Sequence, residues 1–145
     1  MIPNQSGLIV LAALLAGCAM PSHPEGPGGV LTGTQVEAGR EFDIAAGQEA
    51  QVRGTTLTIR FVGISEDSRC PSDVQCVWAG DAVARLALSA TGTAGAEASL
   101  HTTLDPKVTS YAGYRISLTG LRPVPRSGTT IPAAGYVATL EVRPL

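Results

Sequence analysis

The residues best able to do chemistry lie in one short stretch, from Asp67 to Asp81. It holds the only tryptophan of the chain, two of its three cysteines and three aspartates. Two thiols at this spacing could hold zinc or copper together with His101 and an aspartate, or one thiol could act as a nucleophile with His101 as its base. The sequence offers no second cysteine pair and no histidine beside the cysteines. We therefore expect no metal, no cofactor and no catalytic residue.

The carboxylates of this stretch raise the question of a calcium site. Asp67, Asp73 and Asp81, with Glu66, supply the oxygen ligands that calcium prefers. Their spacing fits no EF-hand loop, and Asp and Ser commonly bind backbone groups in turns. We therefore expect the aspartates to cap turns of this loop, and Arg69 to clamp the loop through a carboxylate.

The first residues of the chain have the pattern of an export signal. Residues 8–16 form an apolar run, which is too short for a bilayer span of about 20 residues but suits the apolar part of a signal peptide. The run leads into Leu15-Ala16-Gly17-Cys18, which resembles the lipobox of bacterial lipoproteins. The resemblance implies that residues 1–17 are removed and that Cys18 is acylated. One feature departs from the pattern, because residues 1–7 contain no Lys or Arg.

The residues after Cys18 bear on location. Ala19 stands where an aspartate would resemble the inner-membrane retention signal of Gram-negative lipoproteins, so the outer membrane is favoured. Residues 18–40 are rich in Pro and Gly and have no hydrophobic period, which predicts a flexible tether. His23 lies in this tether, where we expect a solvated side chain without a role. The protein would then be held at the membrane through the lipid on Cys18.

Export also decides the state of the other two cysteines. An exported protein meets an oxidising compartment, so we expect a disulfide between Cys70 and Cys76 that closes a small rigid loop. Trp78 is expected to plug the core beneath this loop, beside the disulfide. The side chains inside the ring are the candidate contacts with a partner: Ser72, Asp73, Val74 and Gln75.

Residues 41–145 are predicted to form strands, because apolar and polar residues alternate. The alternating runs are 42–44, 50–53, 57–61, 84–88, 98–104, 114–118 and 136–142. Turn-forming residues bound each run, so about seven short strands predict an all-β fold, a single antiparallel sandwich or open barrel. Leu104 is expected on an inward face. Residues 121–126 contain two prolines and are expected to form an edge or an extended connection.

Composition limits the function classes. Only 15% of the residues are charged, the net charge is −2, and the basic residues form no run or patch. A nucleic-acid partner is therefore not expected. The few aromatic residues also argue against stacking platforms for single-stranded nucleic acid or carbohydrate.

The loop resembles the signature of a family of small, mostly uncharacterised bacterial secreted proteins and lipoproteins. The similarity lies in Asp67-Ser68-Arg69-Cys70-Pro71 and in Cys76-Val77-Trp78-Ala79-Gly80-Asp81-Ala82. It continues in the run 114–118 and in Pro123-Val124-Pro125. This resemblance implies a domain of the same kind and brings no activity with it.

Together these observations favour a lipid-anchored cell-envelope protein with a non-catalytic binding or structural role and a protein partner in the envelope. The alternative is an envelope protease inhibitor that presents residues 65–80 as a rigid wedge. Protruding side chains inside the ring would favour the inhibitor. A deep pocket lined by His101 and loop carboxylates would instead favour an enzyme.

Overall fold

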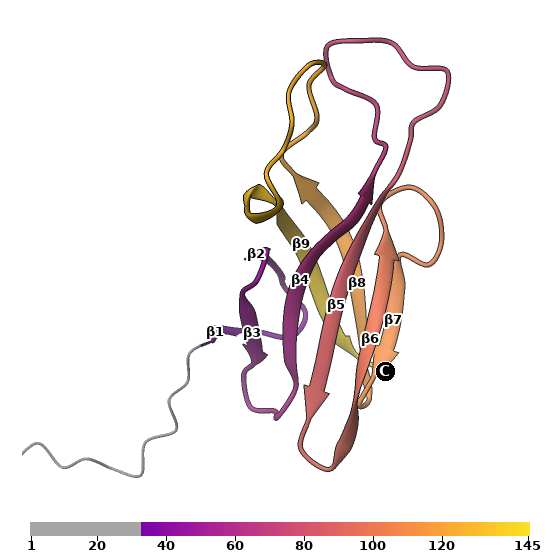
Figure 1. The fold of residues 1–145 in the computed structure, drawn as a ribbon. Helices are drawn as coiled ribbons and strands as arrows, with labels where there is room; N and C mark the ends of the chain where they lie inside the picture. The colour runs from indigo at the N-terminus through magenta and orange to yellow at the C-terminus, as the bar shows by residue number, and fades with distance from the viewer. Residues whose placement is uncertain (1–32) are drawn as a thin grey trace, which may run out of the picture. The chain divides into compact units, whose positions relative to one another are not determined.

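The computed structural model describes residues 33–145, which form two β-sheets packed face to face (Figure 1). One sheet has the order β1-β3-β4-β5-β6, and the other has the order β2-β9-β8-β7. The strands are β1 (Thr34–Val36), β2 (Glu41–Ala45), β3 (Glu49–Val52), β4 (Thr58–Asp67), β5 (Ala82–Ala90), β6 (Thr93–His101), β7 (Val108–Tyr111), β8 (Tyr114–Arg122) and β9 (Val137–Pro144). The short 3-10 helix η1 (Ala133–Gly135) precedes β9. The fold is thus the predicted all-β sandwich and not a closed barrel.

Neighbouring strands pair antiparallel, except that β1 runs parallel to β3. The described residues contain nine strands rather than about seven, because β1 and β7 each bury only one residue and therefore show no alternation. β1 also lies within residues 18–40, the range predicted to be tether. Residues 34–36 belong to the folded domain rather than to the tether, because β1 pairs with β3 and Val36 is buried.

The alternation of side chains explains the core. In β5, Ala82, Ala84, Leu86 and Leu88 are buried while Arg85 is exposed, and β9 alternates in the same way. Every buried residue of the described chain is apolar or a tyrosine, and the buried set runs from Val36 to Val142. This segment therefore contains a complete hydrophobic core, which is the main source of its stability.

The stretch of residues 121–126 begins as the edge that was expected. Leu121 is buried and pairs with Ala138, and β8 continues to Arg122. β7 pairs only with residues 114–117, so this last part of β8 has a strand on one side only. The expected extended connection begins at Pro123.

The predictions for residues 1–17, Cys18 and His23 lie outside the described residues. Among residues 33–145, no helix has the length and apolar character needed to cross a membrane.

Candidate functional site

The cysteine loop joins β4 to β5 and extends beyond the end of the sandwich (Figure 1). Its two stems continue the pairing of these strands, because Ser68 N donates to Asp81 O at 2.7 Å and Cys70 N donates to Ala79 O at 3.0 Å. Above this base, the predicted disulfide joins Cys70 to Cys76, whose Cα atoms lie 5.9 Å apart. The loop therefore has a defined shape of its own.

The first aspartate of the loop binds the arginine two residues on. Arg69 Nε donates to Asp67 Oδ1 at 2.8 Å, and an Nη2 hydrogen bond of 2.7 Å reaches Oδ2. Tyr136 donates its hydroxyl to the same carboxylate at 3.0 Å. Burial on its own raises the pKa of Asp67, but the hydrogen bonds and charge of Arg69 outweigh it and hold that pKa below its ordinary value. Burial and the Asp67 carboxylate raise the pKa of Tyr136.

Arg69 also reaches the other sheet. Its Nη1 donates to the carbonyl oxygen of Leu121 at 3.0 Å, and its Nη2 donates to that of Pro123 at 2.9 Å. These carbonyls belong to the end of β8 and the residue after it, beyond the reach of β7. The predicted clamp is thus confirmed, and it joins the two sheets as well as shaping the loop.

The second aspartate attaches the loop to its neighbour, residues 123–135. Ser127 donates to Asp73 twice, from its backbone N at 2.9 Å and from its hydroxyl at 2.6 Å. Ser72 N donates to Pro125 O at 2.9 Å. The two loops accordingly lie side by side at one end of the sandwich (Figure 1). The hydrogen bonds from Ser127 lower the pKa of Asp73.

The third aspartate holds the connection between β6 and β7. Asp81 Oδ1 accepts hydrogen bonds from Thr103 N at 2.8 Å and Leu104 N at 3.4 Å. Its Oδ2 lies 2.5 Å from His101 Nδ1, which carries the hydrogen because an ionised carboxylate only accepts. Burial disfavours the charged form of Asp81, but these hydrogen bonds outweigh it and lower its pKa to about 2. Because the chain turns here to meet Asp81, β6 ends at His101, and Leu104 is exposed rather than inward-facing.

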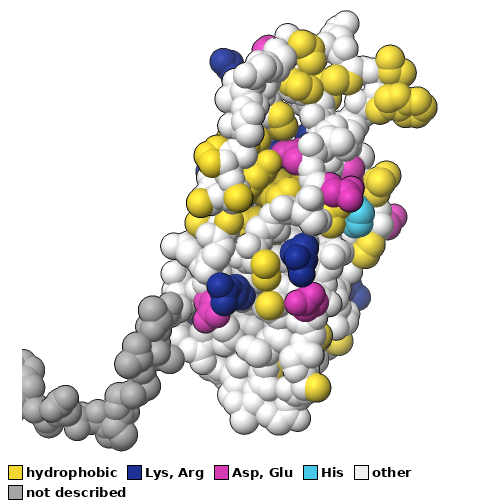
Figure 2. Space-filling model, in the orientation of Figure 1, with side chains coloured by type: hydrophobic (Ala, Val, Ile, Leu, Met, Phe, Trp, Pro, Cys, Tyr) yellow, Lys and Arg dark blue, Asp and Glu magenta, His cyan; other side chains and the backbone are white. Residues whose placement is uncertain are grey.

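The largest correction concerns Trp78, which lies outside the core. Its relative exposure is 81%, and that of Val77 is 92%. The loop extends past the sheets, so no core lies beneath it, and Tyr136 is the aromatic residue buried below. Val74 in the ring and Val124 in the second loop are also exposed. We call these four side chains, Val74, Val77, Trp78 and Val124, the apolar tip. Figure 2 shows hydrophobic side chains gathered at this end of the molecule.

The four candidate contacts, Ser72, Asp73, Val74 and Gln75, are all exposed. Two of them also hold the second loop, Ser72 through its backbone and Asp73 through its carboxylate. The sequence reasoning missed Val77 and the exposure of Trp78. One signal was available, because both residues lie outside every alternating run, among Pro, Gly, Ser and Asp.

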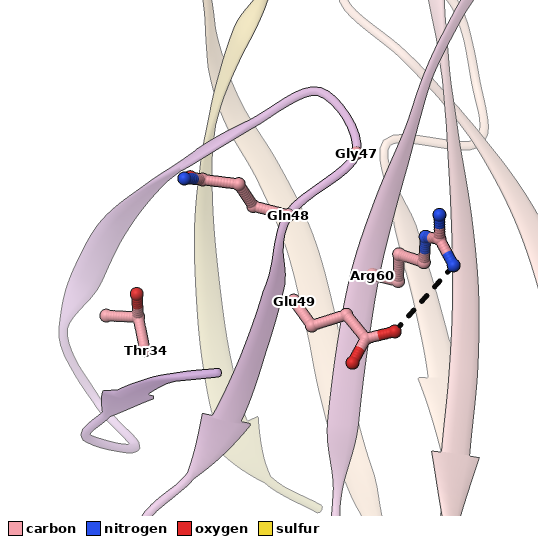
Figure 3. A pocket seen from close by; sticks show the side chains of 5 residues that line it. All are labelled: Thr34, Gly47, Gln48, Glu49 and Arg60. Carbon is pink, nitrogen blue, oxygen red and sulfur yellow. Dashed lines mark ion pairs between the residues drawn. The ribbon is translucent and has the colours of Figure 1, made fainter. Parts of the chain in front are cut away.

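Two hollows are each lined by more than one ionisable side chain. A cleft of about 350 Å³ lies between the two loops and is lined by Asp67, Arg69, Arg126 and Tyr136 among others. A second, of about 330 Å³, lies beside β3 and β4, where Glu49 and Arg60 point toward each other at 3.8 Å (Figure 3). In the first, Asp67 pairs with Arg69, which leaves Arg126 as the one charged lining residue without an ion pair among residues 33–145. In the second, Glu49 pairs with Arg60, so neither hollow gathers several free ionisable groups.

The reactive side chains of the cysteine loop are bonded to other groups of the protein. Cys70 and Cys76 are bonded to each other, so neither sulfur is a thiolate nucleophile or a metal ligand in this state. Asp67, Asp73 and Asp81 bind three different segments rather than one another. Within residues 33–145, no group of three or more His, Cys, Asp or Glu side chains is placed to hold a metal ion.

Comparison of the chain with protein-family models, with curated proteins and with solved structures finds no match. The resemblance of the cysteine loop to a family of bacterial secreted proteins therefore stays a prediction.

Proposed function

We propose that this protein is a lipid-anchored binding module of the bacterial cell envelope, and that the apolar tip is its contact surface. The observation that carries the proposal is the exposure of Val77 and Trp78 at 92% and 81% on a loop held by a disulfide and three aspartates. Large apolar side chains that a protein holds out to water commonly mark interaction sites.

Rigidity supports a binding role. Binding through a mobile loop loses conformational entropy, whereas a loop that is already ordered loses less. The loop is fixed at its base by the β4–β5 pairing, at its side by Ser127 and within by the disulfide. Tryptophan is also among the residue types that most often dominate binding energies.

The anchoring part of the proposal depends on the sequence alone. The apolar run and the lipobox-like residues before Cys18 support export and acylation, and Ala19 favours the outer membrane. The test is to compare the full chain with its Cys18→Ser variant in cell fractions. We expect the parent chain in the membrane fraction with the mass of an acylated cysteine. An unmodified Cys18 in the membrane fraction would contradict this anchor.

The protease inhibitor is the second candidate, and the exposure of the ring residues favours it. However, Val74 N donates to Pro71 O at 3.3 Å, so the ring turns back on itself. Asp73 is also engaged with Ser127. The most exposed side chains lie after the ring, at Val77 and Trp78. We therefore place the contact there and give the inhibitor second place.

The proposed contact surface can be tested by placing a photoreactive residue at Gln75 in the full chain in cells. The control position is Thr93, exposed beside the β5–β6 turn at the opposite end of the sandwich (Figure 1). We expect adducts with protein or lipid from Gln75 and not from Thr93, and their loss in the Trp78→Ser background. Equal adducts from both positions, or none from Gln75, would contradict the proposal.

A further inference from the structure

We propose that the apolar tip docks on a lipid bilayer, with Val77 and Trp78 inserted at the boundary between headgroups and acyl chains. The inference rests on the proposed function and deepens it, because it names what the contact surface binds. Insertion needs apolar side chains that protrude together from a rigid support. The two most exposed residues of the tip are adjacent and follow a disulfide-closed ring. Tryptophan is enriched at membrane interfaces because its ring is apolar and its N–H is polar.

The charges around the tip are compatible with this position. Between Cys70 and Gly80, Asp73 is the only ionisable residue other than the bonded cysteines. Both of its carboxylate oxygens accept hydrogen bonds from Ser127, which reduces the cost of removing it from water. Asp73 stays ionised, so the insertion of Val77 and Trp78 is limited to a depth at which this carboxylate remains among the headgroups.

A cation lies beside the tip. Arg126 precedes Ser127 in the second loop, is exposed, and forms no ion pair among residues 33–145. A guanidinium matches the geometry of a phosphate group. Arg126 lies two residues after Val124 of the apolar tip, so on this proposal it is the cation that binds a lipid phosphate.

The small size of the tip favours a bilayer over a protein. A stable protein complex uses roughly 20–30 residues on each side, whereas the apolar tip has four side chains on two narrow loops. A bilayer demands no such area. Contact with it would be weak on its own, but a chain that a lipid already holds at the membrane meets that surface at a high effective concentration.

The single tryptophan makes the test direct, because all tryptophan fluorescence comes from Trp78. Residues 31–145 contain every described strand and every buried residue of the described chain, so this segment can be used without the apolar N-terminal run. It is mixed with vesicles of phosphatidylcholine, or of phosphatidylethanolamine with phosphatidylglycerol. We expect a blue shift of the emission and quenching by lipids brominated near the headgroups. Emission that stays unchanged at millimolar lipid would overturn the inference.

Matched variants distinguish vesicle binding through the apolar tip from nonspecific binding through exposed valines elsewhere. Val77→Ser and Trp78→Ser should each lower the fraction that floats with vesicles, by about tenfold in the partition coefficient. Val62→Ser and Val108→Ser remove exposed valines from strands β4 and β7 and should leave it unchanged. Equal losses in both sets would overturn the inference.

The two experiments distinguish failure of the bilayer inference from failure of the proposed binding function. If vesicles leave Trp78 emission unchanged while the photoreactive Gln75 captures a protein, the bilayer inference is wrong and the binding module stands. If Gln75 captures neither protein nor lipid, both are wrong. Capture of lipid at Gln75, with the spectral shift, supports both.

Discussion

Arg69 Nη1 donates a hydrogen bond to the carbonyl oxygen of Leu121 at 3.0 Å, and so connects the end of one sheet to the open side of a strand in the other. This carbonyl oxygen would otherwise lack a hydrogen-bond donor from a neighbouring strand, because β7 does not extend this far along β8. The same guanidinium binds Asp67 with two hydrogen bonds. One side chain therefore fixes the base of the cysteine loop and the edge of the second sheet together.

We expect Arg69→Met to lower the free energy of unfolding by about 3 kcal/mol or more, because the variant leaves a mostly buried carboxylate without its cation and two carbonyls without their donor. The side chains of Arg69 and Asp67 are each only 12% exposed. Urea unfolding of residues 31–145 measures the change. Adding Asp67→Asn should recover part of the loss, since it removes the unpaired charge.

The control for Arg69 is Arg85→Met. Arg85 pairs with Glu97 at 3.3 Å, and both side chains are largely exposed. An exposed ion pair contributes about 0–1 kcal/mol. Similar losses from the two arginine variants would show that Arg69 has no special structural role.

Acid should destabilise the domain through the loop aspartates. The folded-state pKa of Asp81 is about 2, against an ordinary value of 3.8, and those of Asp67 and Asp73 are also lowered. A lowered pKa stabilises the folded state above the unfolded pKa, and that stability is lost as pH falls through the folded pKa. The free energy of unfolding should therefore be level near pH 6 and fall between about pH 5 and pH 2.

Asp81→Asn tests the largest of these shifts. After allowance for solvent screening, it should remove about 1–2 kcal/mol of the pH-dependent stability. Urea unfolding at pH 6 and at pH 2.5 measures the slope, and Asp105→Asn is a control on an exposed residue. If Asp81→Asn leaves the acid slope intact, the lowered pKa of Asp81 does not govern it.

The fold could be predicted from the sequence because a strand with one buried face alternates apolar and polar residues. The alternation of β5 and β9 gave both their existence and their inward residues. β1 and β7 each bury a single residue, so neither shows that alternation, whereas β3, which is equally short, buries two alternate residues. β1 also follows a stretch rich in Pro and Gly, so its residues were assigned to the predicted tether.

The candidate site could be predicted from the sequence only in part. The disulfide followed from the cysteine count and export, and the pairing of Arg69 with a nearby acid followed from its neighbours. The bonds from Arg69 to Leu121 and from Ser127 to Asp73 span more than 50 residues, so they depend on how the sheets pack. Trp78 was misplaced because its size argued for burial, while burial depends on whether a core lies beneath the loop.

Removal of the disulfide should weaken the domain without unfolding it. The chain-entropy model gives about 2 kcal/mol for a loop of this length, and the core lies outside the loop. We expect Cys70→Ser with Cys76→Ser to keep the β-sheet circular dichroism and lower the free energy of unfolding by that amount. A chain that is unfolded without the disulfide would contradict this picture. Intact mass with and without reductant checks the bond in the parent chain.

Gly80 is the position of the loop least tolerant of a side chain. Its φ is +70°, and a Cβ there would lie 1.9 Å from the carbonyl oxygen of Ser68. Gly54 has a similar φ of +74° but no atom within 4 Å of such a Cβ.

Gly54→Ala therefore measures the backbone cost alone, about 1–2 kcal/mol, and Gly80→Ala should cost roughly 1–3 kcal/mol more, because the opposite stem must move. That movement loosens the bond from Cys70 N to Ala79 O beside Trp78. The fluorescence anisotropy of Trp78 should accordingly fall in Gly80→Ala and not in Gly54→Ala. Equal stability losses with unchanged anisotropy would mean that the stems do not hold the apolar tip.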